Sequence, residues 1–297
     1  MLKDNRVRLN RTLSSTVMNR SIKKNLRSIL AKASILAIFV ATQIFSTPTF
    51  AAADPGSPGP LPVLAKDYGS YTPISGLLPT AGTAKVEFLG RVWYPATMTG
   101  SYPLIIMLHG QHGTCYGTSV APQMFPCVAP YANNVPNYAG YDYLAKQLAS
   151  YGYIVASISA NGVNALPPTI QTLQNNVGQL RAELIQKHLD LWRLYNNGQD
   201  PWGGVFRGHV DLTRVGTLGH SRGGEGVVRH YIYNKSLGSP YGIKAVLPLA
   251  PTNFGRHAIN GVPMAVLLPY CDGDVSDLQG ARYFDDNRYN VAGDNEG

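Results

Sequence analysis

The amino-acid sequence predicts an α/β domain in which a mostly parallel sheet carries helices on both faces. Short, uninterrupted apolar runs alternate along the chain with segments whose apolar residues recur at helical spacing. A run that is apolar throughout is typical of a strand buried on both faces, as in parallel sheets. Because crossovers between parallel strands are right-handed, such alternation places helices on both sides of the sheet.

The chain is expected to begin with an export signal over residues 1–53. Residues 1–32 hold nine Lys or Arg and one acid, and an apolar run of 13 residues follows from Ala33 to Phe45. Small residues then lead to a cleavage site after Ala51 or Ala53. The run is shorter than the roughly 20 residues of a membrane span, so we expect a secreted protein with no membrane anchor after cleavage. The alternatives are an amphipathic or disordered tail, or an uncleaved anchor.

The elements of the domain follow a linker. Asp54–Leu64 is rich in proline and glycine, which predicts a linker that neither helix nor sheet crosses, and the domain is expected over 65–297. Apolar runs predict strands over 85–94, 103–108, 153–158, 214–218, 243–249 and 263–268. Apolar residues at helical spacing predict helices over 141–151, 170–195 and 223–233.

The positive charge of the chain does not indicate a nucleic-acid partner. The formal net charge is +8, and the leader accounts for all of it. The remaining residues hold equal numbers of basic and acidic side chains, which leaves no basic patch for a polyanion.

Ser221 stands between a predicted strand and a predicted helix, in the stretch Gly219-His220-Ser221-Arg222-Gly223. A nucleophile on a sharp strand-to-helix turn needs glycine two residues before and two after it, because a Cβ there would collide with the neighbouring strand or helix. The helix then brings the positive end of its dipole towards a developing oxyanion. The alternative is a serine that only caps the helix.

This stretch resembles the nucleophile elbow of the α/β-hydrolase family. In that family a His-Gly turn after an earlier strand supplies one oxyanion-hole amide, and here His109-Gly110-Gln111 follows the 103–108 strand. The resemblance implies the α/β-hydrolase fold, Ser221 as the nucleophile, and the N–H groups of Gln111 and Arg222 as oxyanion donors.

The resemblance also implies a catalytic aspartate in the turn after the 263–268 strand. Counting from Pro263, as the family pattern does, points to Asp272. Asp274 is the alternative if the strand is two residues longer.

Two clusters raise the question of a metal ion. His109 and His112 have no carboxylate or third histidine at ligand spacing, and Asp272, Asp274 and Asp277 lack the spacing of an EF-hand loop. We therefore expect no metal and no other cofactor.

A serine nucleophile needs a general base, and the family places a histidine after the aspartate. None of the seven histidines follows Asp274, so we expect a chain that stops before its last strand, with the catalytic histidine beyond residue 297. The alternatives are a variant that recruits His257, or one that has lost catalysis.

Three cysteines follow the leader. Cys115 and Cys127 flank one loop and are expected to form a disulfide in an oxidising compartment, which leaves Cys271 over. The loop Gln111–Tyr138, which carries both of these cysteines, follows the oxyanion turn, and Tyr116, Phe125, Tyr131 and Tyr138 could line the site from it.

The chain is therefore expected to be a secreted serine hydrolase that cleaves carboxylic esters through an acyl-serine intermediate. The segment 251–261 is too short for a cap domain, which predicts an open site. The order of elements and the stretch from Val262-Pro263 to Cys271-x-x-Asp274 resemble secreted polyester and cutinase-like hydrolases. The alternatives are an acyltransferase or peptidase with the same apparatus, or a non-catalytic binding protein of this fold. We expect a monomer.

Overall fold

The computed structural model describes residues 54–121, 123–171 and 176–288. The chain divides into two units, Met1–Asp54 and Pro55–Gly297, and all described residues except Asp54 belong to the second. The predicted export signal, residues 1–53, lies outside the described residues.

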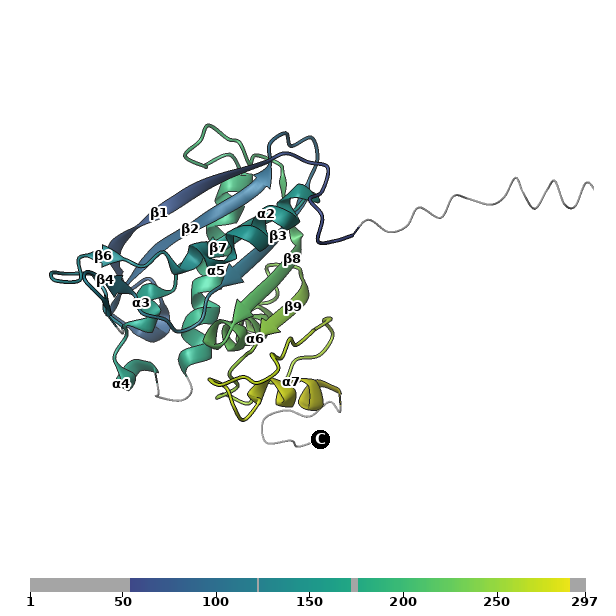
Figure 1. The fold of residues 1–297 in the computed structure, drawn as a ribbon. Coiled ribbons are helices and arrows are strands. Elements are labelled where there is room, and N and C mark those ends of the chain that lie inside the picture. Colours follow the sequence, from purple (N-terminus) through teal and green to yellow (C-terminus); the bar gives the residue numbers. More distant parts are fainter. Residues whose placement is uncertain (1–53, 122, 172–175, 289–297) are drawn as a thin grey trace, which may run out of the picture. The chain divides into compact units, whose positions relative to one another are not determined.

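A six-stranded sheet forms the centre of the domain (Figure 1), and the predicted α/β class with a mostly parallel sheet is confirmed. In spatial order its strands are β1 (Val63–Ser75), β2 (Lys85–Pro95), β7 (Ile154–Ile158), β3 (Tyr102–Leu108), β8 (Val210–His220) and β9 (Ile243–Leu249). Strands β7, β3, β8 and β9 are parallel to one another, whereas β1 and β2 pair antiparallel at one edge.

Helices cover both faces of the sheet because the buried strands are apolar on both sides. The helices are α2 (Asp142–Ser150), α3 (Asn161–Asn164), α4 (Pro168–Gln171), α5 (Asn176–Asn196), α6 (Arg222–Ser236) and α7 (Gln279–Arg288). In β3, Leu104 and Ile106 pack in the core formed with α5 and α6. Met107, which points the other way, packs in the core formed with α2.

The carboxyl ends of three parallel strands lie level with one another. Leu108 of β3 pairs with Gly219 of β8, and Gly219 pairs with Pro248 of β9. The residues that follow these strands therefore meet at one edge of the sheet, where sites form in open α/β folds.

The segment predicted as a strand over 263–268 runs parallel to β9 but forms only two isolated bridges, Val246 with Met264 and Leu249 with Leu267. The N–H groups of Ala265 and Leu267 donate to Val246 and Pro248 of β9. Pro248 has no backbone N–H to donate to the neighbouring segment, so one hydrogen bond between the two segments is missing.

The stretch predicted as a linker is attached to the domain. The N–H of Gly59 donates to the Ser150 hydroxyl (2.7 Å), and the N–H of Leu61 donates to the Ser150 carbonyl (3.1 Å). The prediction that no strand enters 54–64 is wrong at its end, because β1 begins at Val63 and pairs there with Pro95. The last proline is Pro62, so the N–H groups beyond it are free to join a ladder.

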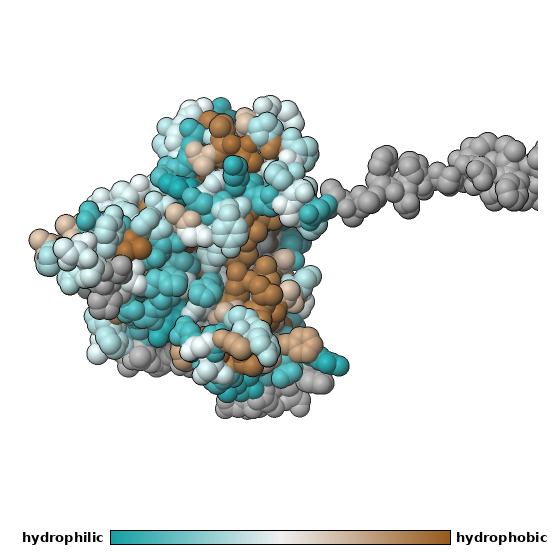
Figure 2. Space-filling model, viewed as in Figure 1, coloured by the Kyte–Doolittle hydropathy of each residue, from teal (hydrophilic) through white to brown (hydrophobic). Residues whose placement is uncertain are grey.

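The surface of the domain carries a few apolar areas within a largely hydrophilic exterior, as Figure 2 shows for one face. Large apolar side chains that stay exposed include Tyr270, Leu267 and Phe254. No helix in the described part of the chain is long and apolar enough to cross a membrane.

Buried histidines make the stability of this fold depend on pH. The His230 ring is fully buried on α6, where its Nε2 lies 3.1 Å from Gln186 Oε1, and burial lowers the pKa of His230 to about 3. In the unfolded chain a histidine has a pKa of about 6.5. Between these two values the unfolded state binds a proton that the folded state does not, so the stability present above pH 6.5 falls as the pH drops.

We predict that His230→Gln weakens this dependence. One such histidine contributes a loss of about 1.4 kcal/mol per pH unit, so the fall in unfolding free energy from pH 7 to pH 5 should be about 2 kcal/mol smaller in the variant. Urea unfolding at the two pH values measures it. Equal falls in the two proteins would mean that His230 accepts a proton without unfolding.

Candidate active site

Ser221 joins the end of β8 to the start of α6 with a strained backbone. Its φ is 54° and its ψ is −122°, a region that residues other than glycine seldom occupy. The Ser221 N–H donates to the carbonyl of Leu249 (2.9 Å), and its carbonyl accepts from the N–H groups of Gly224 (2.9 Å) and Thr252 (3.2 Å). These bonds from β9, α6 and the following loop hold the turn in place, as such conformations require.

The hydroxyl of Ser221 takes no part in holding the helix. Ser221 occupies the N-cap position of α6, but its side chain makes no capping hydrogen bond to the described part of that helix. The alternative in which the serine serves only as a helix cap is therefore not supported. The hydroxyl instead faces a cavity.

Glycines on either side of Ser221 let three chain segments approach closely. A Cβ on Gly219 would lie 2.2 Å from the carbonyl oxygen of Gly223, and a Cβ on Gly223 would lie 2.3 Å from the carbonyl oxygen of Leu108. These distances give the steric reason for the glycine spacing seen in the sequence. The absence of a Cβ at Gly223 also lets the end of β3 lie against the first turn of α6.

The turn after β3 is held from below by a buried histidine. His109 accepts a hydrogen bond at Nε2 from the N–H of Ala160 (2.8 Å), so its proton lies on Nδ1, which donates to the Gly110 carbonyl (2.8 Å). Burial lowers the pKa of His109 to about 3, which keeps the ring neutral. Asn164 Nδ2 also donates to the Gly110 carbonyl (3.0 Å). His109 is thus part of the framework beneath the turn.

This turn lies directly against Ser221. A Cβ on Gly110 would lie 2.9 Å from Ser221 Cβ. Within the described residues, neither the N–H of Gln111 nor that of Arg222 has a hydrogen-bond acceptor. Two amide groups therefore remain available on the segments that flank the serine.

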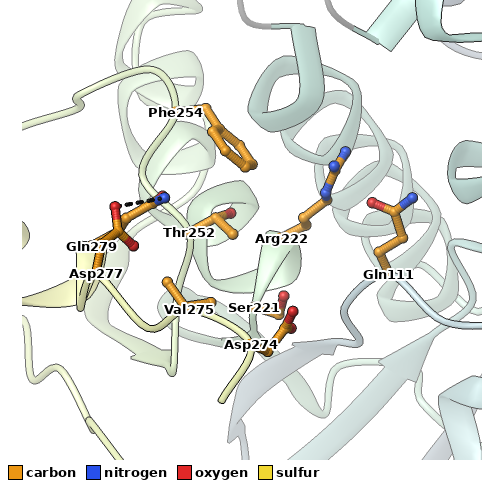
Figure 3. A pocket seen from close by; sticks show the side chains of 9 residues that line it. All are labelled: Gln111, Ser221, Arg222, Thr252, Phe254, Asp274, Val275, Asp277 and Gln279. Atoms are coloured by element: carbon orange, nitrogen blue, oxygen red, sulfur yellow. Dashed lines mark hydrogen bonds between the residues drawn. The ribbon is translucent and has the colours of Figure 1, made fainter. Parts of the chain in front are cut away.

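A cavity of about 250 Å³ opens beside the Ser221 hydroxyl (Figure 3). Its lining residues are Gln111, Ser221, Arg222, Thr252, Phe254, Asp274, Val275, Asp277 and Gln279. The cavity thus contains the predicted serine, both predicted amide-bearing residues and one of the two predicted aspartates.

The two candidate aspartates occupy different positions. Asp274 is exposed and lines the same cavity as Ser221 (Figure 3). Asp272 is half-buried, and its Oδ1 accepts from the N–H groups of Asp274 and Val275 (3.0 Å each). Asp272, the first choice from sequence, therefore shapes the turn, and Asp274 is the one of the two that lines the Ser221 cavity.

No histidine lines the Ser221 cavity within the described residues. His112 and His220 line a neighbouring cavity with Tyr141 and Leu249, and their rings lie parallel 5.8 Å apart. Burial lowers the pKa of His220, and the negative charge of Asp274 acts in the opposite direction and raises it.

His257, the alternative base within the chain, is tied to its own loop. Its N–H donates to Asn253 Oδ1 (3.0 Å), and its Nε2 is buried without a partner among the residues that the structure describes. It does not line the cavity, so the arrangement gives no support to recruitment of His257.

The predicted disulfide is confirmed. The Sγ atoms of Cys115 and Cys127 lie 1.99 Å apart, and Cys271 is free and exposed. Around the disulfide, a small sheet forms from strands β4 (Cys115–Tyr116), β5 (Val120–Ala121) and β6 (Asn133–Asn134). None of the four aromatic residues expected to line the site from this region does so.

Five lining residues were not predicted for this site from sequence: Thr252, Phe254, Val275, Asp277 and Gln279. Thr252 and Phe254 closely follow β9, so the rule that sites form at carboxyl ends of parallel strands could have found them. Asp277 stands just before α7 and Gln279 at its start, and this helix was not predicted from sequence. No group of three or more metal-ligating side chains is gathered within 54–121, 123–171 and 176–288.

The sequence matches no protein-family model, and it matches no curated protein. The function proposed below therefore rests on the geometry of this site.

We predict that Gly223→Ala destabilises the domain, because the new Cβ would meet the backbone oxygens of Leu108 (2.3 Å) and His109 (2.7 Å). Overpacking of this kind typically costs about 1–3 kcal/mol of unfolding free energy. Urea unfolding measures the loss.

Gly273→Ala is the matched control, since a Cβ there has open space within 4 Å. It should change stability by no more than about 0.5 kcal/mol. Equal stability of the two variants would contradict the close approach described for Gly223.

Proposed function

We propose that this protein is a serine hydrolase of the α/β-hydrolase fold, with Ser221 as its nucleophile and carboxylic esters as its substrates. The observation that carries the proposal is the Ser221 turn. A serine with positive φ stands between strand and helix, its hydroxyl is free of helix capping, and it faces a cavity. Strained backbone of this kind concentrates at functional sites.

The order of the strands supports the fold assignment. A βαβ arrangement with β8 in the interior of the parallel sheet places the serine at the level where β3 and β9 also end. This agrees with the position that the nucleophile elbow takes above the sheet in that family.

In the proposed reaction, the Ser221 oxygen attacks the ester carbonyl carbon while a general base takes its proton. The carbonyl oxygen becomes negative and accepts hydrogen bonds from the N–H groups of Gln111 and Arg222, which have no other acceptor among the described residues. Collapse of the intermediate expels the alcohol, which takes the proton from the base. Water then attacks the acyl-serine with the help of the same base, and the acid is released from Ser221.

Asp274 is proposed to orient the base. It lines the cavity beside Ser221, whereas Asp272 is occupied by two backbone N–H groups. A histidine beyond residue 297 as the base stays a prediction from sequence. Secretion likewise stays a proposal, supported by the Cys115–Cys127 disulfide, since disulfides persist in oxidising compartments.

We predict that Ser221→Ala abolishes both covalent labelling by a fluorophosphonate and hydrolysis of p-nitrophenyl butyrate by the full-length protein. The expected fall in kcat/KM is at least about a thousandfold, because no other group replaces the nucleophile. Ser236→Ala is the control, since that hydroxyl bonds to the Tyr233 carbonyl at the far end of the same helix (2.7 Å).

An unaltered protein that neither labels nor hydrolyses the ester would contradict the proposal and favour a binding protein. Labelling with turnover of amides in place of esters would favour a peptidase. Labelling with acyl transfer to an added alcohol in place of water would favour an acyltransferase.

We further predict that Asp274→Asn lowers kcat/KM by roughly 10²–10⁴-fold, because an amide cannot stabilise a charged base. Asp272→Asn should have less than about a tenfold effect, since the asparagine oxygen can still accept the N–H groups of Asp274 and Val275. Steady-state kinetics of the two variants with the same ester decide between them. A large loss confined to Asp272→Asn would reverse the assignment.

A further inference from the structure

Glu225 is a fully buried carboxylate one turn after Ser221 on α6. Its Oε2 accepts from the Thr252 hydroxyl (2.9 Å), and its Oε1 accepts from the N–H of Gly255 (2.8 Å). Both donors belong to the segment 251–257 that follows β9, which we call the Thr252 segment. One side chain thus joins the helix that carries Ser221 to the loop that faces it.

The Thr252 segment forms one wall of the Ser221 cavity through Thr252 and Phe254. Phe254 is half-exposed, and the Arg222 guanidinium lies over its ring at 5.3 Å. The segment has no regular secondary structure, so its position depends on side-chain contacts. Figure 3 shows Thr252 and Phe254 on the side of the cavity opposite Gln111.

Other contacts also hold this segment, both at its start and beyond Phe254, where the Arg256 guanidinium donates two hydrogen bonds to the buried Asp286 carboxylate (2.7 and 3.0 Å). The Tyr283 hydroxyl donates to the Thr252 carbonyl (2.9 Å), and Pro251 lies so close to Gly224 that a Cβ on that glycine would come within 2.7 Å of it. The bond from the Gly255 N–H to Glu225 lies beyond Phe254 in the chain. Glu225 therefore holds the wall on both sides of Phe254.

A carboxylate in this position is costly, and the structure compensates for it. Burial raises the pKa of Glu225, whereas the Gly255 N–H, the Thr252 hydroxyl and the charges of Arg181 and Arg222 act to lower it. Because a buried carboxylate is costly without hydrogen bonds, the two bonds make the position of Glu225 and that of the Thr252 segment depend on each other.

We propose that Glu225 is a positioning residue that holds the Thr252 segment against the turn at Ser221 and thereby determines which size of substrate group fits beside Phe254. The inference rests on the proposed ester hydrolysis at Ser221. It concerns selectivity, because the carboxylate lies beneath the wall of the cavity and does not line it.

The experiment measures selectivity as a ratio of two kcat/KM values, which does not depend on the fraction of active protein. One pair is p-nitrophenyl octanoate and acetate, which differ in the acyl group. The other pair is the hexyl and methyl esters of butyric acid, which differ in the alcohol. Glu225→Met keeps the length of the side chain and removes both acceptors.

We expect Glu225→Met to change one of the two ratios by about tenfold, the scale on which a few methylene groups are discriminated in a pocket. Glu225→Gln should restore most of the change, because its oxygen can accept from Gly255 and its amide can bond to the Thr252 hydroxyl. If Glu225→Met does not fold, Glu225→Asp takes its place in the experiment. This variant keeps the charge but is one methylene too short to reach both donors, so it should shift the same ratio.

Glu183→Met is the matched control. Glu183 is also buried and accepts from a threonine, through the hydroxyl (2.6 Å) and N–H (3.0 Å) of Thr80, but it does not line the Ser221 cavity. The Glu183→Met variant should be less stable than the unaltered protein but should keep both selectivity ratios. The inference alone would be overturned by unchanged ratios in active Glu225 variants, or by an equal change of the ratios in Glu183→Met. An unaltered protein that cleaves none of these esters would overturn both the inference and the proposed function.

Discussion

The backbone of Ser221 is the constraint on which the rest of the site depends. Its positive φ persists because three hydrogen bonds hold it: its N–H donates to the Leu249 carbonyl of β9, and its carbonyl accepts from the N–H groups of Gly224 in α6 and Thr252 in the Thr252 segment. Such a conformation costs of order 1–3 kcal/mol, and the surrounding packing must supply that energy. This backbone conformation turns the Ser221 hydroxyl away from the helix and towards the cavity.

Two buried polar arrangements support the segments on either side of this turn. Below the Gly110 turn, a neutral His109 and the amide of Asn164 both donate to one carbonyl, and Asn164 in turn accepts from the buried Arg181. Below the opposite wall, Glu225 accepts from Thr252 and Gly255. Burial lowers the pKa of Arg181 to about 9, and the charge of Glu225 acts against that fall, so each buried ion favours the charged form of the other.

The elements that local pattern determines were predictable. The strands β3 and β7 are apolar runs whose side chains are mostly buried, and β9 is apolar apart from Lys244; each was expected within a residue or two of its observed bounds. The disulfide followed from the twelve-residue separation of Cys115 and Cys127 across one loop. By contrast, β1 is exposed along most of its length, so it lacks the apolar signal by which the other strands were recognised.

The sequence by itself determined the α/β class, the disulfide and the glycine spacing around Ser221, because each depends on residues close together in the chain. Only the tertiary structure shows that Asp274 lines the Ser221 cavity while Asp272 accepts the turn's own N–H groups, since neither position can be read from spacing in the sequence. The wall made by Thr252 and Phe254, and its attachment to Glu225, were likewise decided by contacts across about 30 residues of chain. Hydrogen bonds of this kind join segments whose separation leaves no periodic pattern in the sequence.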